Sequence, residues 1–231
     1  MKTPIEQIPL TYPILPRYGR EDFLVSSSNE KAFELFERWP DWSDPICLVL
    51  GPSGAGKSHL AAMWGEQAKA LRLTLADLSQ ADLSTLPAGA AVVLEDADAC
   101  GLDETALFHL CNLTLEHKGW LVITAQQRPD LWGLALADLL SRLRRALSVE
   151  IDQPDDALVR AVLVKLFLDR QLRVDTGLIE FLALRIERSL DAARSIVDVL
   201  DREALSQQRA ITRPMASEVL RRLDEGREVQ G

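Results

Sequence analysis

The chain is organised around residues 48–60, which read Leu48-Val49-Leu50-Gly51-Pro52-Ser53-Gly54-Ala55-Gly56-Lys57-Ser58-His59-Leu60. An apolar run of strand character, Ile46–Leu50, leads into a glycine-rich turn, and a helical pattern begins at Lys57. Gly51, Gly56, Lys57 and Ser58 fit G-x-x-x-x-G-K-[ST], the spacing of a phosphate-binding loop. The motif lies between a strand and a helix, which is the structural context that it requires.

Each part of this stretch has a role in holding phosphate. The glycines let successive backbone N–H groups turn toward phosphate oxygens, and the N-terminus of the following helix adds partial positive charge. Lys57 then reaches the β- and γ-phosphates, and the Ser58 hydroxyl is a ligand for Mg²⁺. The alternative, a glycine turn between a core strand and a surface helix, leaves Lys57 unexplained. We therefore predict that residues Gly51–His59 bind ADP or ATP together with Mg²⁺.

Composition limits the other partners. The 231 residues are 47% hydrophobic, enough for one domain with a small appendage, and the formal net charge is −9. Nucleic-acid affinity comes largely from neutralising phosphates with Lys and Arg, so we expect no direct sequence-specific binding of nucleic acid. No segment approaches the roughly 20 apolar residues of a membrane span, and the first residues are not a signal peptide. We expect a cytoplasmic protein without membrane contact.

The three cysteines do not form a recognisable framework. Cys47, Cys100 and Cys111 are an odd number at no disulfide spacing. Together with His109 and His117 they match no familiar pattern of zinc ligands. We interpret them as buried thiols in a reducing compartment.

The chain divides into three parts. Residues 1–21 contain four prolines, which favour an extended tail. In this tail Gln7, Ile8 and Leu10 form a strip that fits packing on the chain's own domain or docking elsewhere. Residues 22–153 form the predicted nucleotide-binding core, and residues 154–231 form a predicted all-helical subdomain.

Strand and helix patterns alternate in the core. Near-continuous apolar strands imply an α/β fold with a parallel five-stranded sheet covered on both faces. The predicted strands are Ile46–Leu50, Leu73–Leu78, Ala91–Leu94, Trp120–Thr124 and Leu147–Ile151. After Pro154 the pattern is helical only. The predicted helices there are Asp155–Leu172, Thr176–Arg188, Leu190–Ser206 and Arg213–Glu225.

Polar residues at the ends of two strands extend the candidate site. Glu95 and Asp96 follow a buried strand, and in phosphate-loop enzymes such acids hold Mg²⁺ and orient the attacking water. We predict Glu95 as a Mg²⁺ ligand with Ser58. Thr124, at the end of the next strand, fits a sensor of the γ-phosphate or a holder of the water, and equally an ordinary threonine at a strand end.

Two arginines in the second half are candidates for contact with phosphate. Arg142 lies among three arginines in four residues, a pattern that also fits a solvated helix face. Arg194 falls in the first turns of the third helix of the predicted subdomain. It could instead pair with Asp191 or Asp198 along that helix, an interaction worth about 0.2–0.5 kcal/mol.

Taken together, these features resemble the AAA+ ATPases, and within them the DnaA branch. Gly56–Leu60 is similar to that branch's G-K-[TS]-H-L, and Asp138–Leu143 resembles its arginine-finger segment. The resemblance implies that Phe23 and Leu24 line an adenine pocket. It also implies that the helical subdomain is a lid, from which Arg194 swings onto the bound nucleotide. Arg142 then reaches the ATP γ-phosphate of a neighbouring subunit.

Within this branch the chain resembles the Hda-type regulatory inactivators of DnaA. It shows neither an N-terminal helicase-loading domain nor a C-terminal helix-turn-helix domain. Gln7-Ile8-Pro9-Leu10 is similar to the tail motif with which that type binds the sliding clamp, the β subunit of DNA polymerase III. The resemblance therefore implies DnaA and the clamp as partners, and it allows a homodimer.

The implied function is to stimulate hydrolysis of DnaA-bound ATP, with ADP bound and the tail on the clamp, and so to prevent over-initiation. The chain departs from the family at Glu95, where the family usually has aspartate; the longer stem displaces the carboxylate and leaves the chain's own hydrolysis weak or absent. Two alternatives stay open, a nucleotide-gated adaptor or localisation factor and an ATPase of the helicase-loader type.

Overall fold

The computed structural model describes residues 19–228, so the tail motif formed by Gln7, Ile8 and Leu10 lies outside the described residues. The core is one parallel sheet with the strand order β2-β3-β4-β1-β5. The strands are β1 (Ile46–Leu50), β2 (Leu71–Leu73), β3 (Ala91–Leu94), β4 (Trp120–Ala125) and β5 (Leu147–Glu150). Every residue of β1 and β3 is buried, as expected where helices cover both faces of a sheet. The predicted five-stranded parallel sheet is confirmed.

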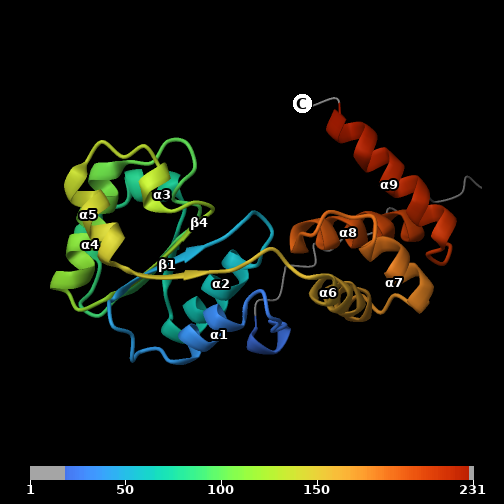
Figure 1. Ribbon diagram of the computed structural model, residues 1–231, viewed down its shortest axis with the longest axis horizontal. Coiled ribbons are helices and arrows are strands. Elements are labelled where there is room, and N and C mark those ends of the chain that lie inside the picture. Colours follow the sequence, from blue (N-terminus) through green and yellow to red (C-terminus); the bar gives the residue numbers. More distant parts are fainter. Residues whose placement is uncertain (1–18, 229–231) are drawn as a thin grey trace, which may run out of the picture.

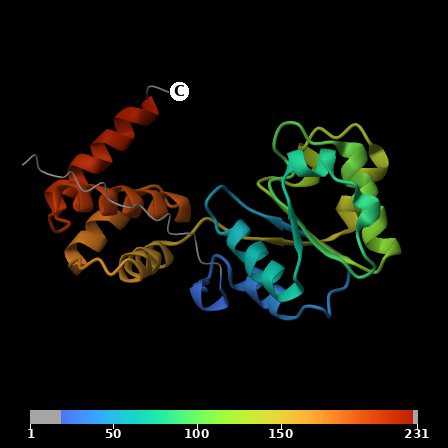
Figure 2. The same ribbon diagram turned by 180° about the vertical axis from the view of Figure 1, so that it is seen from behind.

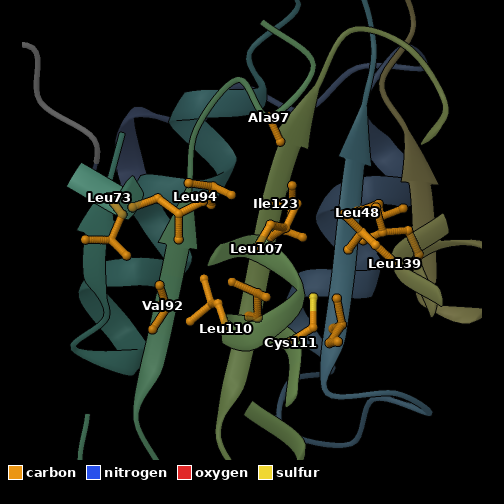
Figure 3. Close-up of a cluster of buried hydrophobic side chains, with 14 of the residues drawn as sticks. Leu48, Leu73, Val92, Leu94, Ala97, Leu107, Leu110, Cys111, Ile123 and Leu139 are labelled. Carbon is orange, nitrogen blue, oxygen red and sulfur yellow. The ribbon is translucent and has the colours of Figure 1, made fainter. Parts of the chain in front are cut away.

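Helices pack on both faces of this sheet (Figure 1). Helices α1 (Glu30–Glu37) and α2 (Lys57–Ala68) contribute to one hydrophobic cluster. The opposite face is covered by α3 (Leu75–Gln80), α4 (Glu104–Glu116) and α5 (Ala137–Arg145). Figure 3 shows Leu107, Leu110 and Cys111 of α4 packed against apolar side chains of the strands. Short 3₁₀ turns lie at η1 (Arg20–Asp22), η2 (Leu83–Thr85) and η3 (Pro129–Leu131).

The predicted strand Leu73–Leu78 was wrong. Strand β2 ends at Leu73 and α3 begins at Leu75. Thr74 starts the helix with a capping box, in which its hydroxyl accepts from the Asp77 N–H at 3.2 Å and the Asp77 carboxylate accepts from the Thr74 N–H at 2.9 Å. Such reciprocal bonds satisfy two donors that a helix start leaves without intrahelical partners. The apolar residues of this stretch concealed the T-x-x-D signal.

The cysteines also differ from expectation at one position. Cys47 and Cys111 are buried, and burial raises the pKa of both thiols, to about 12 for Cys111. Cys100 is exposed in the loop that follows β3, so its interpretation as a buried thiol was wrong.

Four further helices form the helical lid: α6 (Asp156–Asp169), α7 (Thr176–Ala183), α8 (Leu190–Gln207) and α9 (Arg213–Glu228). They share a hydrophobic cluster of their own. The side chains of Asp155, Asp175 and Ser189 cap the first three helices by accepting backbone N–H groups. Figures 1 and 2 show the lid at one end of the molecule and α4 and α5 at the other. Among residues 19–228, no helix combines the length and apolar character needed to cross a membrane.

A candidate nucleotide cleft between core and lid

A cleft of about 460 Å³ lies at the carboxyl ends of β1, β3 and β4, where the lid meets the core. Ligands of open α/β sheets bind at this edge of the strands. Its walls come from the glycine-rich loop, the start of α2, the loops after β3 and β4, and the first turns of α8. The lining residues are Ser53, Gly54, Gly56, Lys57, Ser58, His59, Asp96, Asp98, Ala99, Gln126, Gln127, Leu131, Trp132, Asp191 and Arg194.

The loop between β1 and α2 depends on its glycines. Gly51, Gly54 and Gly56 have positive φ values of 151°, 68° and 106°. A Cβ added at Gly51 would lie 2.3 Å from the carbonyl oxygen of Ile151, and one at Gly54 would lie 1.9 Å from Ser189 Oγ. Glycine is therefore required at Gly51 and Gly54 by both backbone conformation and the close approach of neighbouring segments, and at Gly56 by backbone conformation alone.

Lys57 is held against this loop. Its Nζ donates to the carbonyl oxygens of Gly51 and Pro52 at 2.8 and 2.9 Å, and its side chain is buried. Burial lowers the pKa of Lys57, while the surrounding carboxylates, Asp96 foremost, oppose that shift. The ammonium group is thus placed at the loop itself, where it can exchange carbonyl partners for phosphate oxygens. Pro52 and Ala55, also predicted to contact nucleotide, do not line the cleft.

The acidic residues predicted after β3 lie beside the loop. Glu95 accepts from Ser58 Oγ at 2.7 Å and from Thr124 Oγ1 at 3.3 Å through the same oxygen, Oε2. Its other oxygen, Oε1, accepts from Arg72 Nη2 at 2.6 Å. Thr124 is completely buried and also accepts from the backbone N–H of Asp96 at 2.9 Å. The structure therefore brings together Ser58, Glu95, Asp96 and Thr124, and ties the strand tip to the phosphate loop.

Asp96 carries a carboxyl next to the carboxylate of Glu95. Desolvation, and next the charge of Glu95, raise its pKa, while Lys57 opposes the shift. Its backbone has a φ of 51°, in the left-handed region that non-glycine residues seldom adopt. Asp96 lines the cleft, whereas Glu95 does not.

The side-chain oxygens of Ser58 and Glu95 are suited to binding Mg²⁺. A hydroxyl and a carboxylate in direct contact are oxygen ligands of the type that Mg²⁺ takes. No group of three or more His, Cys, Asp and Glu side chains within residues 19–228 is arranged to hold a metal ion. An ion at Ser58 and Glu95 would therefore take its remaining ligands from water and nucleotide phosphates, as Mg²⁺ does in nucleotide sites.

The lid contributes the opposite wall through the start of α8. The Leu190 N–H donates to the Gly54 carbonyl at 2.8 Å, so the helix begins directly on the phosphate loop. Asp191 and Arg194 line the cleft from this helix. They also form the intrahelical pair considered above, with Arg194 Nη1 3.4 Å from Asp191 Oδ1. A cationic side chain and a helix N-terminus thus face the same space as the phosphate loop.

The predicted adenine-pocket residues lie beside the cleft rather than in its wall. Phe23 is buried, stacked on Phe33 at 5.5 Å between ring centroids and edge-on to His59 at 5.2 Å. Neither Phe23 nor Leu24 lines the cleft, whereas His59 does. Burial, and next the charge of Arg194, lower the pKa of His59 to about 4. His59 is thus a neutral aromatic contact between the cleft and the N-terminal segment.

Arg142 lies outside the cleft. It belongs to α5, and its guanidinium carbon is 5.4 Å from the ring centroid of Phe108 on α4. Its Nε is buried and has no hydrogen-bond partner among the described residues. Arg144 differs, because its Nε donates to Asp130 at 2.7 Å. Helix α5 lies at the end of the core away from the lid (Figure 1).

Known structures share this arrangement of sheet, loop and lid. Domain III of the Thermotoga maritima replication initiation protein DnaA superposes with a TM-score of 0.75 and 18% identity, covering 91% of this chain and 98% of that one. The fold is that of an AAA+ domain. AMPPCP-bound DnaA from Aquifex aeolicus gives a TM-score of 0.65 and 20% identity, over 82% of this chain and 67% of that one. The RuvB Holliday junction branch migration motor of T. maritima gives 0.68 and 14%, over 89% and 72%.

Sequence comparison adds less. No family model matches the chain. An uncharacterized protein of Haemophilus influenzae is 27% identical over 215 residues, which cover 88% of this chain and 90% of that protein.

Sequence reasoning missed several residues at this cleft. Asp98 accepts the backbone N–H groups of Gln126 and Gln127 at 2.8 and 2.9 Å, which joins the loops after β3 and β4. Trp132 lines the cleft and donates its indole N–H to the Gln127 carbonyl at 2.7 Å. These residues follow parallel strands, whose carboxyl-end loops meet at one edge of the sheet. That rule could have nominated Asp98, but no sequence signal marks Trp132 or Arg72.

Proposed function

We propose that this chain is a regulator of replication initiation that acts on DnaA. With ADP in its own cleft and residues Gln7–Leu10 docked on the sliding clamp, it presents Arg142 to ATP bound on DnaA and stimulates hydrolysis of that ATP. The likeness to domain III of the replication initiation protein DnaA supports a role in replication initiation. Adenine nucleotide is supported by the AMPPCP-bound DnaA structures of the same fold.

The placement of Arg142 is the observation that carries this proposal. Its guanidinium is not part of the chain's own cleft, and its Nε makes no hydrogen bond within residues 19–228. The Phe108 ring supports the guanidinium of Arg142 at 5.4 Å from its centroid. An arginine supplied to a neighbouring phosphoryl group stabilises charge in the transition state, a contribution of about 10³–10⁵ in rate.

The chain's own site serves in this proposal as a nucleotide-dependent part of the structure. Lys57, Ser58 and Arg194 hold the nucleotide between core and lid. Mg²⁺ bound near Ser58 and Glu95 would neutralise phosphate charge. Both carboxylate oxygens of Glu95 already have partners, Ser58 on one and Arg72 on the other, which supports weak hydrolysis by the chain itself. ADP would thus be a stable occupant.

The test follows hydrolysis of ATP prebound to DnaA in the presence of clamp on DNA, ADP and the full chain. The wild type should accelerate hydrolysis by orders of magnitude, and Arg142→Ala should abolish the effect. Arg144→Ala is the matched control, because it removes the same charge from the same helix but from a guanidinium paired with Asp130. It should retain most of the stimulation.

The outcomes separate the functional classes. Equal losses in both variants would show that helix charge, and not a finger, is responsible. A wild type that binds ADP, clamp and DnaA without accelerating hydrolysis would refute the inactivator and favour a nucleotide-gated adaptor.

A second candidate, an autonomous ATPase of the helicase-loader type, is favoured by Asp96. Its carboxyl lines the cleft and has a raised pKa, as suits a group that accepts a proton from an attacking water. Steady-state turnover by the isolated chain, lost in Lys57→Ala, would support this candidate. Turnover at background level would exclude it.

A further inference from the structure

The N-terminal segment, residues 19–25, lies between the core and the lid. Figures 1 and 2 both show its first turn beside α1 and α6. In this turn the carboxylate of Asp22 lies 2.6 Å from Lys165 Nζ on lid helix α6. The Asp22 and Lys165 side chains are only 10% and 26% exposed. The hydrogen bond to Asp22 is the main cause of the raised pKa of Lys165. The pair is therefore a shielded link between the lid and the N-terminal segment.

The next residue joins the same segment to the core. Phe23 packs edge-on against His59 and stacks on Phe33 of α1. His59 follows Ser58 on α2 and lines the cleft. Two consecutive residues thus bridge lid helix α6 and the helix that begins at the phosphate loop. Neither Asp22 nor Lys165 lines the cleft itself.

This bridge bears on the nucleotide because the cleft has one wall on each part. Gly54 and Lys57 line it from the core, and Asp191 and Arg194 line it from α8. Helix α6 packs on α8 in the lid's hydrophobic cluster, so the position of α6 determines where α8 presents its side chains. Fixing α6 to the N-terminal segment thereby fixes the separation of the two walls.

We propose that Asp22 and Lys165 are positioning residues of the nucleotide cleft. Their ion pair forms when the lid rests against the core, and it raises the population of the arrangement in which both walls contact nucleotide. Removing the pair lowers that population, and nucleotide affinity falls by the same factor. This inference rests on the nucleotide binding assumed in the proposed function, and it adds a determinant of affinity that never touches the ligand.

The chain provides its own control for the test. Lys165 also pairs with Asp169 at 2.9 Å, one turn further along α6, and that pair lies wholly within the lid. Asp22→Asn and Asp169→Asn therefore each remove one carboxylate charge from the same ammonium group. Only Asp22→Asn breaks a contact between the lid and the N-terminal segment, which packs on the core. Asp22→Glu keeps the charge and should preserve the link.

The measurement is calorimetric titration of the full chain with ADP. Asp22→Asn should weaken binding about two- to fivefold, the upper part of the range for ion pairs, whereas Asp169→Asn and Asp22→Glu should stay within about twofold of the wild type. Melting temperature without nucleotide separates this effect from a general loss of stability, since neither Asn variant should unfold the chain. Equal ADP affinities of the two Asn variants would overturn the inference while leaving the proposed function intact. Failure of the wild type to bind ADP would overturn both.

Discussion

Replacing Gly54 by alanine tests whether the lid must rest on the phosphate loop for nucleotide to bind. The new Cβ would lie 1.9 Å from Ser189 Oγ and 2.9 Å from Ser189 Cβ, distances that non-bonded atoms do not adopt. Ser189 must therefore move away. Because Ser189 is the N-cap of α8, the helix start moves with it and the bond from the Leu190 N–H to the Gly54 carbonyl is lost.

The expected loss of ADP affinity is obtained by separating the backbone strain at Gly54 from the loss of contact with the lid. Alanine at a φ of 68° costs roughly 1–2 kcal/mol, but this strain is present with and without nucleotide and cancels from the affinity. The lost hydrogen bond and the displaced helix start act on the closed lid alone, at about 1–2 kcal/mol together. Since 1.4 kcal/mol is a factor of ten, ADP should bind Gly54→Ala about tenfold more weakly.

Gly89→Ala is the matched control. Gly89 has a φ of 76°, yet a Cβ there would meet no atom within 4 Å. Gly89→Ala should lose only the backbone term in urea unfolding, Gly54→Ala should lose at least as much, and only Gly54→Ala should lose affinity for ADP in calorimetry. The double variant Gly54→Ala with Ser189→Gly removes the overlapping side chain and should regain part of the affinity. If it regains none, or if Gly89→Ala weakens binding equally, the argument from lid contact fails.

The remaining predictions concern residues at the rim of the site. The pKa of His59 in the folded chain, about 4, lies below its ordinary value of 6.5, so the unfolded chain binds the proton first. About 3 kcal/mol of stability should be lost as pH falls from about 6.5 to 4, and urea unfolding of His59→Asn should show a smaller pH dependence. Arg72→Ala removes the cation from Glu95 Oε1 and should lower the Mg²⁺ concentration for half-maximal nucleotide binding, unlike Arg128→Ala, which breaks an exposed pair with Glu150. Thr124→Val leaves the Asp96 N–H without its partner and should cost about 1–3 kcal/mol in urea unfolding, whereas Thr114→Val, which loses only a bond to a helix carbonyl, should cost less.

The fold could be predicted because its signals are local. The order of strands and helices follows from apolar runs and caps such as Asp175 and Ser189, and all four lid helices begin within one residue of the predicted positions. The exception, α3, shows the limit of apolar pattern alone. Its start depends on two reciprocal hydrogen bonds between Thr74 and Asp77. The three-residue spacing of these polar residues indicates a helix start, whereas the pattern of apolar residues does not.

The site was less predictable because its partners come from distant parts of the chain. The motif places Ser58 at the loop, and the strand tip supplies Glu95, but the pairing of Glu95 with Arg72 depends on β2 lying next to β3. Trp132 enters the cleft through a short turn with no motif. The roles of such residues depend on how distant segments pack together. Sequence patterns identify only residues whose local backbone structure is set by their neighbours in the chain.

The structure also bears on how ADP could influence Arg142 although the two lie apart. Gln126, Gln127 and Trp132 line the cleft, and the same segment continues directly into α5. Asp98 fixes the start of this segment through two backbone N–H groups, and the Glu104 carboxylate on α4 accepts the N–H groups just before α5 at 3.1 and 2.7 Å. The segment is thus held at both ends and has the cleft along its length. This segment is therefore the shortest covalent connection between the cleft and the helix that carries Arg142. If Arg142 acts as the proposed arginine finger, this segment is the route by which nucleotide in the cleft would influence it without direct contact.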